Sequence, residues 1–187
     1  MDRFVLDRTD LVLLMLLAPD SKGQLVPLHG ITRLQKLLYL VKQETNIELA
    51  EGSRFEFKAY KYGPFAQELY EVVDFLENAE FVSVGKGQDE DIYSLEEAVP
   101  IAEEIDPGDE YEIDIGSAPP YDERIFGLTP DGRKVAEGLK AQLLADDWSQ
   151  IKDIKHRYGD RSLTSLLVYV YRTYPNSASE TELKHLL

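Results

Sequence analysis

Histidines are the side chains in this sequence most suited to binding metal or moving protons near neutral pH. His29, His156 and His185 lie far apart, and none has a second histidine at the spacing of a metal-binding pair. Gly85-Lys86-Gly87 lacks the third glycine of a dinucleotide-binding loop, and Asp89-Glu90-Asp91 lacks the spacing of a calcium loop. The chain has no cysteine, no Gly-x-Ser-x-Gly and no P-loop. We therefore expect no enzyme, no cofactor and no bound metal.

Charged and aromatic side chains form two sets of candidate binding residues. A set of basic residues could contact phosphate groups of nucleic acid, although solvated side chains paired with nearby acids explain it better: Arg33, Lys36, Lys58 and Lys61. A second set combines aromatic and acidic residues and could contact a protein partner: Tyr62, Phe65, Glu68, Glu71 and Asp74. The elements that carry these two sets decide between them.

Apolar spacing predicts six helices and several strands. The helices are expected over Leu11–Leu17 (capped by Thr9 or Asp10), from Gly30 to Val41, over 65–77, from Thr129 through Leu144, over 148–158 and over 162–174, with a short terminal helix over 179–187. Strands are expected over 55–60, 81–84 and 124–128, with 92–95 as a return strand, and a turn at 61–64. The helix at 65–77 should bury Leu69, Val72, Val73 and Leu76, and the helix after Thr129 should bury Val135, Leu139, Leu143 and Leu144.

Helix, strand, glycine-proline turn and helix follow one another in the order that a winged-helix module uses. The sequence thus predicts an α+β, winged-helix-like domain over residues 1–145 with an acidic wing insertion, and a helical C-terminal extension over 146–187 packed on it.

The acidic insertion at about 87–124 accounts for most of the net charge of −15, because it contains 14 acidic residues and one basic residue. It could imitate nucleic acid, bind a basic partner or cover the domain's own basic patch. A solvated loop that keeps the protein soluble is the interpretation we favour.

No apolar stretch reaches the roughly 18 to 20 residues that a membrane helix needs. The strongest candidate, Leu11–Leu17, is too short and follows acidic residues, so a buried helix is expected. We expect a cytoplasmic protein with no membrane partner.

Two stretches give the chain a family resemblance. The first is Leu34-Gln35-Lys36-Leu37-Leu38-Tyr39-Leu40, and the second comprises Tyr60-Lys61-Tyr62-Gly63-Pro64-Phe65 with Glu68-Leu69-Tyr70. Over roughly residues 30–83 the chain resembles the YwgA-like bacterial proteins and, more distantly, the SocA-like antitoxin domain also called Panacea. Panacea-type turns usually have valine after Gly-Pro, where this chain has Phe65. The resemblance implies an interaction role, such as toxin neutralisation, adaptor function or regulation, and no catalytic residues.

Two functional hypotheses follow. The first is a non-enzymatic protein-binding module that uses the acidic and aromatic set, because the helix at 65–77 contains no basic residue and would repel a polyanion. The second is a winged-helix DNA-binding regulator that uses the basic set. A homodimer formed through the C-terminal helices is compatible with this role. A place in a defence or mobile-element system fits either hypothesis.

Overall fold

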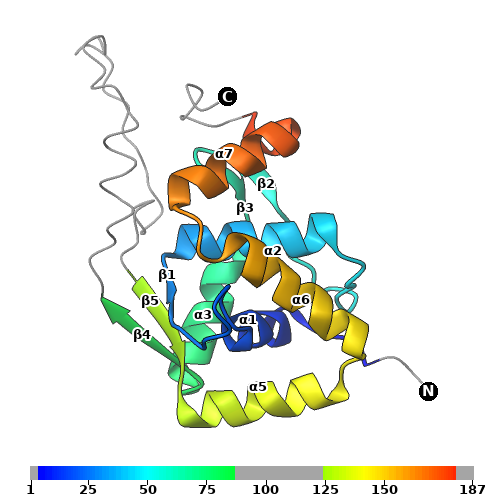
Figure 1. The fold of residues 1–187 in the computed structure, drawn as a ribbon, viewed down its shortest axis with the longest axis vertical. Coiled ribbons are helices and arrows are strands. Elements are labelled where there is room, and N and C mark those ends of the chain that lie inside the picture. Colours follow the sequence, from blue (N-terminus) through cyan, green and yellow to red (C-terminus); the bar gives the residue numbers. More distant parts are fainter. Residues whose placement is uncertain (1–3, 87–123, 180–187) are drawn as a thin grey trace.

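Helices and short antiparallel strands make up the chain over residues 4–86 and 124–179, which a computed structural model describes (Figure 1). The elements, in chain order, are α1 (Arg8–Leu17), β1 (Leu28–His29), α2 (Ile31–Glu44), β2 (Lys58–Tyr60), β3 (Gly63–Phe65), α3 (Glu68–Asn78), β4 (Val82–Lys86), β5 (Arg124–Leu128), α5 (Pro130–Gln142), α6 (Ala145–Tyr158), α7 (Leu163–Thr173) and the 3₁₀ helix η1 (Pro175–Ala178). The predicted α+β class is confirmed.

Helix α1 lies at the centre of the described fold, and every residue from Leu11 to Leu17 is buried. It contacts α2, α3, α5, α6 and β5 (Figure 1). A helix that is apolar on all sides is expected to be surrounded by other elements. The predicted caps Thr9 and Asp10 were wrong, because Asp7 is the cap and the helix begins at Arg8. Asp7 accepts a hydrogen bond from the Asp10 amide at 2.8 Å while Asp10 accepts one from the Asp7 amide at 3.0 Å, which is a reciprocal capping box.

Three strands form an antiparallel sheet in the order β1-β5-β4. The pairing of β4 with β5 runs from Val82 opposite Leu128 to Lys86 opposite Arg124. Residues 87–123 therefore connect two neighbouring strands. The strand predicted over 124–128 is confirmed, and the one predicted over 81–84 extends to Lys86. The predicted strand at 92–95 and all but the first residue of the helix at 179–187 lie outside the described residues.

A second, two-stranded sheet corrects the predicted turn. Lys61 and Tyr62 form the loop of a hairpin, and Gly63-Pro64 belongs to strand β3 and not to the turn before a helix. Pro64 pairs with Ala59, one position beyond the pair that closes the loop. In an antiparallel hairpin this position exchanges no ladder hydrogen bonds, so the missing proline N–H costs nothing.

The hairpin also moves the start of the next helix. Helix α3 begins at Glu68, three residues after the predicted start, because Phe65 pairs with Lys58 in the hairpin. The expected strand over 55–60 is likewise shorter, since only Lys58–Tyr60 forms ladder pairs. The predicted buried stripe of α3 is confirmed in full: Leu69, Val72, Val73 and Leu76.

Helix α5 has the predicted cap, because Thr129 accepts a hydrogen bond from the Gly132 amide at 3.0 Å and Pro130 is the first helical residue. Its predicted apolar face is confirmed in part, because Leu139 and Leu143 are half-buried and pack against the hydrophobic core. Val135 is 37% exposed and Leu144, which lies beyond the helix, is 57% exposed. The buried residues of α5 are Gly132 and Ala136, whose small side chains let the helix approach its neighbours closely.

Helices α6 and α7 share one hydrophobic core with the preceding elements. Ile151 and Ile154 of α6 and Leu166 and Val170 of α7 are fully buried in the same cluster as α1 and α2. The division of the chain at residue 145 stays a prediction. Among the described residues, no helix is both long and apolar enough to cross a membrane.

Candidate functional site

The outer face of α3 is acidic and contains one exposed phenylalanine. Glu71 and Asp74 are exposed, and Glu68 in the first turn is half-buried. Phe75 leaves 58% of its side chain exposed, and it lies one turn after Glu71 on the same side of the helix. We call these four residues the acidic face.

Phe75 was not among the predicted partner-binding residues. Its signal in the sequence is its position off the buried stripe of α3, between Asp74 and Leu76. An aromatic residue on the polar side of an amphipathic helix has no core to fill, so the helical period alone could have identified it as a contact residue.

A row of three aromatic rings joins the β2–β3 hairpin to α3. The ring centroids of Tyr60 and Phe65 are 5.1 Å apart, and those of Phe65 and Tyr70 are 5.9 Å apart. Tyr60 is 41% exposed and the other two are half-buried. Phe65, one of the two aromatic residues predicted for partner contact, thus lies in an aromatic row beside the acidic face. The other, Tyr62, is half-buried and packs against the hydrophobic core.

The two stretches that carry the family resemblance contact each other. Gln35 of α2 donates a hydrogen bond to the Ala66 carbonyl at 3.0 Å and accepts one from the Ala66 amide at 2.9 Å. The next residue, Lys36, donates from Nζ to the Pro64 carbonyl at 3.0 Å. The polar residues of the Leu-Gln-Lys-Leu motif therefore hold the backbone that leads into α3.

Gly63 completes this contact from the other side. Its φ of 82° lies in the left-handed region that glycine tolerates best. A Cβ at this position would lie 2.6 Å from a ring carbon of Tyr171 on α7. The Gly-Pro backbone is therefore held between α2 and α7, which positions the aromatic row.

Arg33 and Lys36 were predicted as surface cations for nucleic acid, and this was wrong. Arg33 is 5% exposed and Lys36 is 2% exposed, so neither is placed to meet a phosphate group. Arg33 donates hydrogen bonds to the carbonyls of His29, Gly159 and Arg161. Two of these carbonyls follow the end of α6, so Arg33 satisfies backbone acceptors in the connection between α6 and α7.

Burial also changes the acidity of two lysines. The loss of solvation lowers the pKa of Lys36 to about 7. Lys155 of α6, whose Nζ donates to the Met15 carbonyl at 3.3 Å, is 2% exposed, and its burial lowers its pKa to about 8. Lys36 links α2 to strand β3 and Lys155 links α6 to α1, each through a backbone carbonyl.

Of the predicted nucleic-acid set, Lys58 and Lys61 remain outside the core. Lys58 is exposed on β2, and Lys61 is half-buried in the hairpin loop. The predicted four-residue set is therefore reduced to these two side chains of the hairpin.

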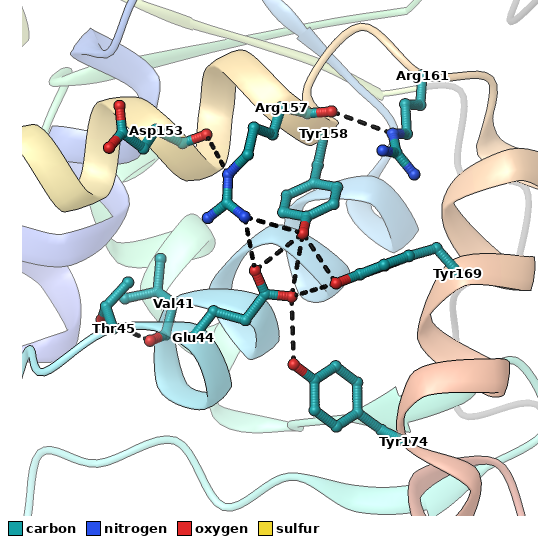
Figure 2. Close-up of polar contacts among 9 residues, drawn as sticks. All are labelled: Val41, Glu44, Thr45, Asp153, Arg157, Tyr158, Arg161, Tyr169 and Tyr174. Carbon is teal, nitrogen blue, oxygen red and sulfur yellow. Dashed lines mark hydrogen bonds and ion pairs between the residues drawn. The ribbon is translucent and has the colours of Figure 1, made fainter.

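Glu44, the last residue of α2, is the centre of a polar cluster (Figure 2). Its carboxylate accepts hydrogen bonds from the hydroxyls of Tyr158 at 2.8 Å, Tyr169 at 2.7 Å and Tyr174 at 3.2 Å. Arg157 adds an ion pair at 3.2 Å. These partners come from α6, α7 and the residue after α7, so the cluster fastens both C-terminal helices to the end of α2.

Three phenol hydroxyls surround the Glu44 carboxylate as donors. Each phenol has one proton, and all three hydroxyls lie within hydrogen-bond distance of a carboxylate oxygen. Desolvation, and then hydrogen bonds to Tyr169 and Glu44, raise the pKa of Tyr158, and desolvation followed by the charge of Glu44 raises that of Tyr174. Tyr158 and Tyr174 therefore stay protonated donors at neutral pH, and their hydrogen bonds to Glu44 hold α6 and the residue after α7 against the end of α2.

Glu44→Gln should destabilise the fold by about 2 kcal/mol, because a neutral amide accepts weaker hydrogen bonds and leaves Arg157 without its carboxylate. The free energy of unfolding from urea titrations at pH 7 measures the effect. Glu48→Gln, at an exposed position just after α2, is the matched control and should change stability by less than about 0.5 kcal/mol. Equal stability of Glu44→Gln and the wild type would contradict a charged anchor.

Among the described residues, no group of three or more histidine or carboxylate side chains is placed to hold a metal ion. Comparison with protein-family models, curated proteins and solved structures finds no match to this chain.

Proposed function

We propose that the protein is a non-enzymatic protein-interaction module of the antitoxin or adaptor type that works in the cytoplasm. Its contact surface is the acidic face of α3 together with the aromatic row of Tyr60, Phe65 and Tyr70. The YwgA-like and Panacea resemblance of the sequence supports the same role. A partner with a basic surface and an apolar contact point fits this combination of charge and exposed rings.

We also propose that the fold is a winged helix. The order α1, β1, α2, α3, β4, β5 and the sheet order β1-β5-β4 support it, with the β2–β3 hairpin inserted between α2 and α3. In this interpretation α3 takes the place of the helix that enters the DNA groove, and residues 87–123 are an acidic wing.

The observation that carries the proposal is the charge of α3. Glu71 and Asp74 are exposed, the helix contains no basic residue, and its exposed apolar side chain is Phe75. DNA-binding affinity comes largely from lysine and arginine contacts to phosphate, so such a helix repels a duplex. The same charges attract a basic protein surface, and the phenylalanine supplies an apolar anchor.

A winged-helix DNA-binding regulator is the second candidate, within a defence or mobile-element system. The element order favours it, and a homodimer would suit it. Burial of Arg33 and Lys36 weakens it, because two of the four expected phosphate contacts are engaged with backbone carbonyls.

Charge reversal of the acidic face tests the proposal. A partner is first captured from the native host by pull-down, or identified by co-expression with a toxic neighbouring gene, and its affinity is then measured. Glu71→Lys combined with Asp74→Lys should weaken binding at least tenfold (about 1.4 kcal/mol), and more at low salt. The matched control, Glu137→Lys with Asp153→Lys, reverses two exposed acids on α5 and α6 and should leave the affinity unchanged.

A gel-shift series with genomic fragments discriminates the second candidate. DNA binding that weakens steeply with salt and disappears in Lys58→Glu with Lys61→Glu would replace the protein-partner proposal. A protein that captures no partner and rescues no toxicity would also contradict it.

A further inference from the structure

A second candidate site lies on a different part of the molecule, between α1, α2 and the segment 46–57. It is a cavity of about 190 Å³ whose inner wall consists of Leu11, Leu38, Val41 and Phe55. All four side chains are buried at the cavity wall. The space is therefore apolar, and it is smaller than the pockets of roughly 300 Å³ or more that hold drug-sized ligands.

Two cations line the same cavity. The ammonium of Lys42 lies 5.8 Å from the ring centroid of Phe57, and Arg54 is exposed on the outer segment. Over residues 4–86 and 124–179, neither side chain forms an ion pair or a hydrogen bond. Glu48 is the one acidic residue in the lining, so the lining has an excess positive charge of one.

The segment that forms the outer wall is hydrogen-bonded to the rest of the fold at two points and contains one internal turn. The Ala50 amide donates to the Leu6 carbonyl at 2.8 Å, and the Ser53 amide donates to the Ala50 carbonyl at 2.9 Å. The backbone amide of Asn46, at the start of the segment, donates a hydrogen bond to the side-chain oxygen of Gln150 at 2.8 Å. The cavity is therefore already formed in the folded chain, which lowers the entropic cost of binding.

An apolar space beside two such cations is complementary to an anion with a small apolar body. We propose that this cavity binds a small amphipathic carboxylate, with its hydrocarbon part between α1 and α2 and its carboxylate between Lys42 and Arg54. Each part alone is a weaker fit, because a neutral hydrocarbon leaves the cations without a counter-ion and acetate leaves the apolar wall empty.

Octanoate is the probe, with octanol, octylammonium and acetate as comparisons, and calorimetric titration of the full chain at pH 7 is the measurement. Octanoate should bind at a single site at least tenfold more tightly than octanol or octylammonium, and acetate should show no saturable binding. Equal affinities for octanoate and octanol would overturn the carboxylate assignment. No saturable binding of octanoate would overturn the site.

Two matched double variants and one blocking variant locate the binding. Lys42→Gln with Arg54→Gln should weaken octanoate at least tenfold, whereas Lys58→Gln with Arg133→Gln removes the same charge from exposed positions outside the cavity and should leave the affinity unchanged. Ile47→Trp, at a half-buried position on the cavity wall, should block binding while the circular dichroism spectrum stays that of the wild type. Equal losses in the two double variants, or full affinity in Ile47→Trp, would contradict the proposal.

This cavity shares no residue with the acidic face or the aromatic row. Binding of octanoate and capture of a protein partner can therefore fail or succeed independently.

Discussion

Gly132→Ala should lower the stability of the protein by about 3 kcal/mol, although it adds a single methyl group near the start of a helix. A Cβ at residue 132 would lie 1.8 Å from the carbonyl oxygen of Phe81 and 2.6 Å from its carbonyl carbon. Both atoms belong to the backbone, so no side-chain rotation relieves the overlap. Helix α5 and the chain entering β4 would have to separate.

Hydrogen bonds as well as packing hold the start of α5 to the residues that lead into β4. Thr129 donates from its amide to the Phe81 carbonyl at 3.1 Å, and its hydroxyl donates to the Glu80 carbonyl at 2.6 Å. The same hydroxyl oxygen accepts from the Gly132 amide, so a shift of α5 disturbs the helix cap and the strand entry together. For a chain of this size the loss corresponds to a decrease in Tm of about 6 to 12 °C.

Gly138→Ala is the matched control on the same helix. A Cβ there has no neighbour within 4 Å, so the substitution should stabilise the protein by about 0.5 to 1 kcal/mol through helix propensity. Thermal unfolding of both variants gives the comparison. A Tm for Gly132→Ala equal to or above that of the wild type would show that α5 does not approach β4 this closely.

Regular elements were predictable where local chemistry decides them. Thr129-Pro130 marks the start of α5, and the strand character of Arg124–Leu128 predicts β5, because capping and strand propensity act over a few residues. The buried stripe of α3 was also predictable, since the helical period determines which side chains face the core.

Misplaced elements depend on contacts distant in sequence. Pro64 is compatible with the first turn of a helix or with a strand, and the pairing with Ala59 selects the strand. Two of the four apolar residues predicted to be buried after Thr129, Val135 and Leu144, are exposed for a similar reason. Gly132 lies against the Phe81 backbone and α5 packs against α1, so the small residues Gly132 and Ala136 are buried, whereas the larger Val135 is 37% exposed.

The acidic residues of α3 were predictable from the sequence. The burial of Arg33 and Lys36 was not. Arg33 and Lys36 occupy polar positions in an amphipathic pattern, for which exposure is the ordinary expectation. Their acceptors are the carbonyls of Gly159 and Pro64, which no sequence pattern places beside α2. The structure buries these two cations, and this supports the proposal of a basic protein over DNA as the partner of α3.

Burial of Lys36 should make the stability of the fold increase as the pH rises from 7 to 9. The pKa of Lys36 is about 7 in the folded protein and 10.5 in an ordinary solvated lysine, so the unfolded chain binds more protons across this interval. The free energy of unfolding should therefore rise by about 2 kcal/mol from Lys36 and by about 1 kcal/mol from Lys155, whose pKa of about 8 acts in the same direction. Below pH 7 the cost of the buried charge is present in full and this slope disappears.

Lys36→Met tests the assignment, because methionine has a similar length and no charge to desolvate. At pH 7 the variant should be at least as stable as the wild type, since the lost hydrogen bond to Pro64 costs less than the burial of an ammonium group. At pH 9 that advantage should shrink by about 2 kcal/mol, as the wild-type lysine is neutral in the folded state there. Urea titrations at pH 7, 8 and 9 measure both effects.

The matched control is Lys58→Met, which removes an exposed cation from β2 and should keep the wild-type pH dependence. Measurements stop at pH 9 because the raised pKa values of Tyr158 and Tyr174 oppose the lysine effect once tyrosines of the unfolded chain begin to ionise. If Lys36→Met and the wild type gained stability in parallel from pH 7 to 9, the Lys36 ammonium would have to be solvated. Lys36 would then return to the set of cations open to phosphate, and the case for DNA as the partner would regain one of its two lost contacts.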